Sequence, residues 1–248
     1  MHALLLAAGY GTRLGAMGRK TPKVLLAVPG LQRPLADVLL DEVTAIAGMR
    51  EVWMVTNRRF VTKLEGWMEE ARLRSPVPLH LLCNGTEGPE ERLGAVGDLA
   101  FALERMDVPG ELLVAATDTI LPFPLSRFVQ EGVRRPQAHV LIPVLEEAPE
   151  RLHRRGVVVL GEGDEITEFH EKPTDPPSTT TALPLYLFRP SALTEVFRYL
   201  QEGGEPDELG KLAEWLVPRV RVEGWRASGK RLDLGDPSHW EGETDSGF

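Results

Sequence analysis

Cysteine is almost absent from this chain of 248 residues, which contains only Cys83. A single cysteine excludes a disulfide within the chain, and its place at the end of the apolar run VPLHLLC (77–83) indicates a buried strand thiol. The six histidines are scattered and show no spacing that suits a metal centre. The sequence therefore lacks the patterns of a disulfide scaffold and of a histidine–cysteine metal site.

Long hydrophobic runs and an excess of positive charge are also missing. No apolar run approaches the roughly 20 residues that span a bilayer, and the first one is followed at once by glycines and charges, unlike a signal peptide. The formal net charge of -9 argues against a nucleic-acid-binding surface, which needs a basic stripe. We therefore expect a cytoplasmic protein with no membrane and no nucleic acid among its partners.

Positive charge and glycine instead gather in one stretch, LLLAAGYGTRLGAMGRKTPKVLLAV (4–28), which holds four glycines, two arginines, two lysines and no acid. A dinucleotide fingerprint fails because Leu14 replaces its third glycine and the segment does not lead straight into a helix, and no Walker pattern is present. A glycine loop with Arg13 and Lys23 would suit a polyphosphate. The alternative is a basic surface turn.

Strand-like and helical patterns alternate over the first 145 residues. This rhythm predicts a Rossmann-like α/β fold, with a mainly parallel or mixed sheet and helices on both faces. Strands are expected at 2–8, 51–57, 77–83, 111–117 and 138–144, and helices at 34–49, 58–74, 90–106 and 124–135.

The second part of the chain is richer in strands. GVVVL and ITEFHEK predict a hairpin, followed by a strand at 182–188, helices at 190–202 and 207–217, and the strands RVRVEGW and KRLDLG. We expect one domain, 1–248, with a nucleotide-binding half at 1–145, an acceptor-binding half at 146–240 and a frayed tail at 241–248.

The motif LAAGYGTRL…TPKVLL resembles the signature of nucleotidyltransferases that make sugar nucleotides, such as glucose-1-phosphate thymidylyl-, uridylyl- and cytidylyltransferases and mannose-1-phosphate guanylyltransferases. Three more segments follow in that family's order: LLVAATDTIL, RRGVVVLGEGDEITEFHEKP and RLDLGDPSHW. The resemblance covers nearly the whole chain. It implies transfer of a nucleotidyl group from a triphosphate (dTTP, UTP or CTP) to a sugar 1-phosphate, with release of pyrophosphate.

The resemblance also implies roles for particular residues. Arg13, Lys23, Asp118 and Lys172 would be catalytic. The nucleotide would be bound by Ala8, Gly9, Gly11, Thr12, Arg13, Lys23, Asn84 and Gly94, and the acceptor by Gly156, Glu171, Lys172 and Tyr186. Asp118 and Asp233 would hold Mg²⁺, which binds carboxylates and substrate phosphates.

Other interpretations stay open at this point. Asp118 and Asp233 could be solvated or capping residues, Asn84 a turn residue, and Glu171–Lys172 a surface ion pair. Thr117, Pro184 and Asp236 depart from the family's usual residues, and Pro184 puts a standard sugar pocket in doubt. Phosphocholine is an alternative acceptor, with Trp225 and Trp240 as a cation-binding wall. A non-catalytic nucleotide-binding protein and a homo-oligomer also remain open.

Overall fold

The computed structural model describes the chain from residue 1 to residue 234. The predicted tail 241–248 lies outside the described residues, as do Asp236 and Trp240. The backbone of Arg13 and of Asp233 is described, but their side chains are not.

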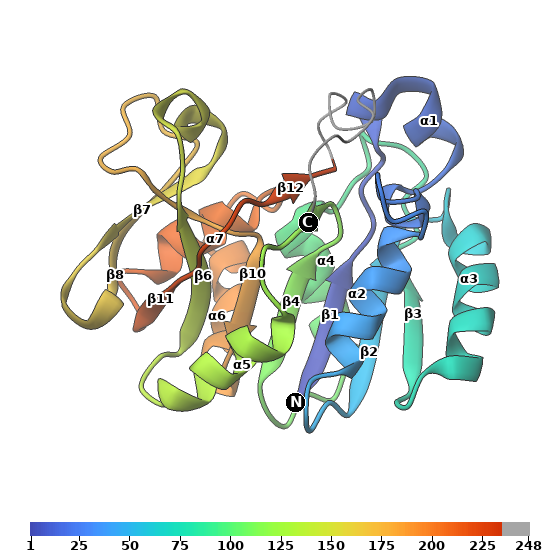
Figure 1. The fold of residues 1–248 in the computed structure, drawn as a ribbon, viewed down its shortest axis with the longest axis horizontal. Coiled ribbons are helices and arrows are strands. Elements are labelled where there is room, and N and C mark those ends of the chain that lie inside the picture. The colour runs from blue at the N-terminus through green and yellow to red at the C-terminus, as the bar shows by residue number, and fades with distance from the viewer. Residues whose placement is uncertain (235–248) are drawn as a thin grey trace.

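Within residues 1–234, ten strands form one mixed sheet (Figure 1). Its parallel part has the order β3-β2-β1-β4, with bounds Leu79–Cys83, Glu51–Thr56, His2–Leu6 and Leu112–Ala116. The order continues through β10-β6-β9-β7-β8, whose neighbours are antiparallel, with bounds Leu185–Phe188, Val140–Glu146, Thr180–Ala182, Gly156–Leu160 and Ile166–Glu171. The predicted α/β class and the β-rich second part are thus confirmed.

Two short additions complete the strand arrangement. Strand β11 (Val222–Arg226) lies parallel to β6. Strands β5 (Thr119–Ile120) and β12 (Leu232–Asp233) form a separate antiparallel pair beyond the end of β4.

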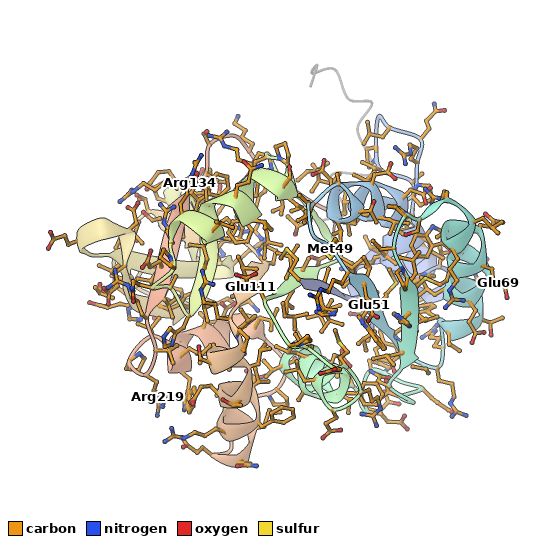
Figure 2. The ribbon with its side chains drawn as sticks, turned by 90° about the horizontal axis from the view of Figure 1, so that it is seen from below. Met49, Glu51, Glu69, Glu111, Arg134 and Arg219 are labelled. Atoms are coloured by element: carbon orange, nitrogen blue, oxygen red, sulfur yellow. The ribbon has the colours of Figure 1, made fainter. Side chains whose placement is uncertain are left out.

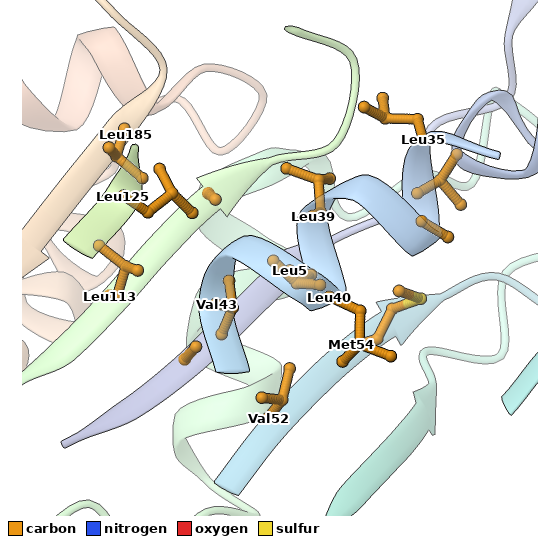
Figure 3. Packing of buried hydrophobic residues seen from close by; sticks show 14 of the residues in the cluster. Leu5, Leu35, Leu39, Leu40, Val43, Val52, Met54, Leu113, Leu125 and Leu185 are labelled. Carbon is orange, nitrogen blue, oxygen red and sulfur yellow. The ribbon is translucent and has the colours of Figure 1, made fainter. Parts of the chain in front are cut away.

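Helices cover both faces of the sheet because side chains alternate along the strands. In β1, Ala3 and Leu5 face one core and Leu4 faces the other. The first core is closed by α2 (Leu35–Thr44), α3 (Val61–Arg74) and α5 (Leu125–Arg134), and the second by α4 (Gly94–Leu103), α6 (Pro190–Gln201) and α7 (Leu209–Leu216). Figure 3 shows the face of α2 that packs on the sheet, with Leu39, Leu40 and Val43 near Leu5, Val52 and Met54.

The glycine loop contains helical turns that the sequence analysis did not predict. A 3-10 turn, η1 (Thr12–Leu14), leads into a short helix α1 (Gly15–Lys20), and a further turn, η2 (Lys23–Leu25), follows. The loop closes on itself: a Cβ on Gly18 would lie 2.1 Å from the carbonyl oxygen of Gly11. A helix of six residues is too short to show a periodic apolar face, which explains why the sequence did not indicate it.

The single strand predicted at 182–188 is two strands, β9 and β10, separated at Leu183 and Pro184. Proline has no N–H to donate to a ladder, but its carbonyl accepts a hydrogen bond from the Ala116 N–H (3.0 Å). The break lets β9 pair with β6 and β7, while β10 pairs with β4 and β6.

The glycine loop and the strand β12 lie at the same end of the sheet. In Figure 1, β1 runs upward from the N-terminus, and α1 and β12 lie above it. Figure 2 is the view from below, toward Glu51 at the start of β2 and Glu111 just before β4. In open α/β sheets, ligands bind beyond the carboxyl ends of the strands. None of the helices in residues 1–234 has the length and apolar character of a membrane span.

Candidate active site

Two adjoining clefts lie beyond the carboxyl ends of β1 and β4. The first has a volume of about 420 Å³ and the second about 290 Å³. The residues lining both are Ala95, Ala116, Asp118, Glu208 and Leu209. Each cleft is therefore lined by residues from both predicted halves of the chain, and two ligands could meet at the shared wall.

The first cleft is formed largely by the glycine loop. Of the residues assigned to the nucleotide, it is lined by Ala8, Gly9, Gly11, Thr12, Lys23 and Gly94. Arg13 lies in η1 beside Thr12. The structure thus gathers most of the nucleotide-binding residues that the resemblance implied.

Asn57 fixes the start of this loop, and the sequence analysis missed it. Its fully buried side chain donates from Nδ2 to the carbonyl oxygen of Ala8 (2.8 Å) and accepts from the N–H of Phe60 (3.1 Å). The available signal was its position, because a polar side chain directly follows a predicted strand at the ligand-binding edge.

Lys23 and Asp118 meet across the first cleft. Their Nζ and Oδ2 atoms are 3.7 Å apart, and the Asp118 side chain is 41% exposed, which leaves it accessible from both clefts. The backbone of Asp233 lies opposite Thr119 in the β5–β12 pair, and the Leu234 N–H donates to the Asp118 carbonyl oxygen (2.8 Å). The fold therefore brings the backbones of the two expected metal ligands together.

A metal centre made only of protein ligands is not found among the described side chains, since no group of three or more His, Cys, Asp or Glu residues there could hold an ion. Magnesium commonly takes one or two carboxylates and completes its shell with water and substrate phosphates. The position of Asp118 is compatible with that kind of site.

Asn84 is not brought into either cleft. Its Nδ2 donates to Oδ1 of Asp98 (2.7 Å), and its Oδ1 accepts from the N–H and the hydroxyl of Thr86 (3.0 and 2.8 Å). Asp98 lines the first cleft in its place. Burial raises the pKa of Asp98 to about 6, opposed by the hydrogen bond from Asn84. A carboxylate on the apolar face of a predicted helix was the missed signal.

The start of α4 is closed by the segment before α7. The N–H of Val96 donates to the carbonyl oxygen of Pro206 (2.8 Å), so this end of the helix is capped by backbone. A Cβ on Gly94 would lie 2.3 Å from that same oxygen, which explains the glycine. The Arg92 guanidinium donates two hydrogen bonds to the Asp207 carboxylate (2.7 and 2.6 Å), and both residues line the first cleft. This pairing was not predicted.

The second cleft contains all four residues assigned to the acceptor: Gly156, Glu171, Lys172 and Tyr186. Three arginines line it as well, Arg154, Arg155 and Arg231. Lys172 forms an ion pair with Glu208, and its Nζ lies 3.9 Å from Oε1 of Glu171. Lys172 has a φ of +51°, an uncommon value outside glycine that places it at a sharp turn after β8.

Glu171 is not a simple surface carboxylate, because only 11% of its side chain is exposed. Burial and the neighbouring charge of Glu208 raise its pKa to about 7, while Lys172 opposes the shift. A Cβ on Gly210 would lie 1.7 Å from Oε2 of Glu171, so the glycine makes room for the carboxylate. Glu171 therefore holds its proton more tightly than an ordinary surface carboxylate does.

Trp225 lies in the core and lines neither cleft. Its ring packs edge-on against Phe123, with centroids 4.8 Å apart, and also near Phe128. It therefore cannot be the cation-binding wall considered for phosphocholine.

Known proteins share this architecture. The structure of UDP-glucose pyrophosphorylase complexed with UDP-glucose superposes with a TM-score of 0.78 at 21% identity, covering 96% of this chain and 95% of that one. At this identity the likeness shows the fold alone.

Two sequence relatives are more similar. The UTP–glucose-1-phosphate uridylyltransferase of Haloferax volcanii is 27% identical over 244 residues, 96% of this chain and 92% of the relative. The mannose-1-phosphate guanylyltransferase catalytic subunit beta of Drosophila melanogaster is 29% identical over 198 residues, and the match covers 79% of this chain but only 50% of that subunit. The family model described as "Nucleotidyl transferase" matches residues 2–241, and this chain belongs to that family.

Proposed function

We propose that this protein couples a nucleoside triphosphate to a sugar 1-phosphate, giving a nucleotide sugar and pyrophosphate. The observation that carries the proposal is the meeting of two clefts at Asp118, one lined by a glycine loop and one by cations and the largely buried carboxylate of Glu171. A triphosphate in the first and a phosphorylated acceptor in the second would put the reacting groups side by side. The activities of the named relatives support the same reaction class.

The proposed reaction requires alignment of the two substrates and positive charge near their phosphates. An oxygen of the acceptor phosphate attacks the α-phosphorus, and the bond from that phosphorus to the pyrophosphate oxygen breaks. The nucleophile is already an anion, so no general base is needed. Lys23 and Arg13 would neutralise the triphosphate, and Lys172 would hold the acceptor phosphate.

Glu171 would accept hydrogen bonds from acceptor hydroxyls. It lines the second cleft and not the first, which supports a role on the acceptor side. A fixed hydrogen-bond acceptor suits the hydroxyl groups of a polyhydroxylated ligand, which supports a sugar phosphate as the acceptor.

Magnesium fits the residues at the shared wall. Asp118 offers an exposed hard oxygen donor next to Lys23, and the pairing of β12 with β5 puts the backbone of Asp233 alongside. Bound there, Mg²⁺ would offset negative charge on the phosphates during transfer.

The test is pyrophosphate release from a matrix of ATP, GTP, CTP, UTP and dTTP against sugar 1-phosphates and phosphocholine. We expect activity with at least one sugar 1-phosphate, and activity lower by about 100-fold or more in the Asp118→Asn variant. Activity confined to phosphocholine would replace the sugar by a phospho-alcohol. Silence across the matrix, with nucleotide binding intact, would favour a non-catalytic binding protein.

A further inference from the structure

A directed chain of hydrogen bonds begins and ends at residues that line the first cleft, Tyr10 and Asp98. The Tyr10 hydroxyl donates to Oγ1 of Thr86 (2.7 Å), that hydroxyl donates to Oδ1 of Asn84 (2.8 Å), and Asn84 Nδ2 donates to Oδ1 of Asp98 (2.7 Å). Tyr10, Thr86 and Asp98 are each less than 8% exposed. The chain therefore ends on a nearly buried carboxylate that lines the cleft.

The direction of this chain is fixed by chemistry. The Thr86 N–H also donates to Oδ1 of Asn84 (3.0 Å), so the amide cannot turn over without losing two accepted bonds. Asn84 is thereby held as a donor to Asp98. None of the described residues donates to the other oxygen of that carboxylate, Oδ2, which leaves it to meet a ligand.

Asp98 lines the first cleft from α4 and not from the glycine loop. The cations expected to bind phosphate lie on the glycine loop, and a nearly buried carboxylate would repel phosphate oxygens. Asp98 instead projects from the second turn of α4, four residues after Gly94 and on the same helix face. With the triphosphate directed to Lys23 and Asp118, the base is the part of the nucleotide left to reach α4.

We propose that Asp98 is a specificity-determining residue, and that its free oxygen favours a nucleobase with an exocyclic amino group over uracil or thymine. The proposal rests on the proposed function, because it assumes that the first cleft holds the triphosphate. An ionised carboxylate only accepts hydrogen bonds, so it pairs with an amino group and not with a carbonyl.

The bases differ in what they offer such an acceptor. Guanine presents two adjacent donors, N1–H and N2–H₂, while cytosine and adenine each present one amino group. Uracil and thymine present N3–H between two carbonyl oxygens, which a carboxylate would repel. A pKa of about 6 leaves Asp98 mostly ionised at pH 7.5, in the accepting form.

Replacing Asp98 by Asn should reverse this preference. The new amide oxygen can still accept from Asn84, which turns the amide nitrogen toward the ligand as a donor. A donor there suits the carbonyl oxygens of uracil and thymine. A residue that only supported the fold would weaken all bases alike.

The experiment measures equilibrium binding of the five Mg²⁺–nucleoside triphosphates by calorimetry, without acceptor, to the wild type and to Asp98→Asn. For the wild type we expect an amino-bearing base to bind more tightly than UTP and dTTP. In Asp98→Asn the affinity for that base should fall about 10- to 100-fold, and UTP and dTTP should gain relative to it. Glu104→Gln, an exposed change just after the same helix, should leave the order unchanged.

Two results would overturn the proposal: tighter binding of UTP or dTTP by the wild type, and an unchanged order of bases in Asp98→Asn. The turnover matrix is separate. If calorimetry shows the expected base selection but no turnover is found, the role of Asp98 stands and the proposed function is wrong. If turnover is found but the base preference does not depend on Asp98, the proposed function stands and the role of Asp98 is wrong.

Discussion

Asp118 and Glu208 are the two charged residues, among those the structure describes, that line both clefts. Their surroundings give them different tasks. Asp118 faces Lys23 at 3.7 Å and keeps much of its surface exposed, which suits a metal or a phosphate complex. Glu208 forms an ion pair with Lys172 and raises the pKa of Glu171, so it sets the electrostatics of the second cleft. One shared wall therefore carries two separable chemical roles.

Asp118→Asn should reduce kcat by about 100-fold or more while leaving the fold intact, because a neutral amide is a poor magnesium ligand. Asp233→Asn should have the same effect. Circular dichroism measures whether the fold is intact, and pyrophosphate release in Mg²⁺ measures kcat. Asp107→Asn, an exposed change between α4 and β4 at a residue that lines neither cleft, is the matched control. Near-normal turnover in either cleft variant would remove that residue from the metal site.

Glu171 should make the protein less stable as pH rises through neutrality. Its pKa is raised from 4.5 to about 7, so the folded state keeps a proton that the unfolded state has released between these values. The free energy of unfolding must then fall as pH rises across this window. Glu171→Gln should raise Tm by a few degrees at pH 8 and leave it nearly unchanged at pH 5. An equal shift at both pH values would contradict the assignment.

Among the elements, the glycine loop depends most on close backbone contact. Gly11 has a φ of +64°, and Gly18 packs directly against it. The helix α1 therefore folds back onto the loop segment that follows β1. Arg59 and Lys63 add hydrogen bonds to the carbonyl oxygens of Arg19 and Lys20. The loop is thus held at α1 by contacts with α3 and at its start by Asn57.

Gly18→Ala should displace this loop, because the added Cβ would lie 2.1 Å from the Gly11 carbonyl oxygen. We expect kcat/KM for the triphosphate to fall about 10-fold or more with a cooperative unfolding transition retained. Gly66→Ala is the control: it lies within α3 with nothing within 4 Å of the added Cβ, and should stabilise the helix by about 0.5–1 kcal/mol without changing kinetics. Wild-type kinetics in Gly18→Ala would mean that the loop tolerates the displacement.

Elements with a strong local pattern could be predicted from the sequence. The apolar runs of β1 and β4 and the β7–β8 hairpin needed only strand composition and turn signals. The break between β9 and β10 at Pro184 could not be predicted from the sequence, because it depends on the pairing of β10 with β4 and β6. The six-residue helix α1 is too short to show a helical spacing of apolar residues.

The site was predictable only where a motif is contiguous. Lys23, Asp118 and Glu171 lie inside recognisable segments, and the fold gathers them at the clefts. The Arg92–Asp207 pair joins residues 115 positions apart, and no local pattern reports such a contact. Asp98 was hidden in a helix whose other residues are apolar.

At the scale of the molecule, the two clefts share a wall, so filling one should shape the other. We expect the triphosphate to bind first, because its negative charge would add contacts to the glycine loop and slow the opening of its backbone. Hydrogen exchange over residues 9–23 should slow with triphosphate and Mg²⁺, and little with sugar 1-phosphate alone. A loop that is already fully protected without ligand would remove the physical basis for ordered binding.

The pairing of β12 with β5 has a consequence for how the protein comes into being. Residues 2–116 supply all four strands of the β3-β2-β1-β4 part of the sheet, yet Asp233 reaches Thr119 only when the last described strand docks. A chain emerging from the ribosome could pair these four strands long before residue 233 has been synthesised. Because the first cleft is also lined by Asp207 and Glu208, newly made protein would lack the complete cleft until most of its length is in place.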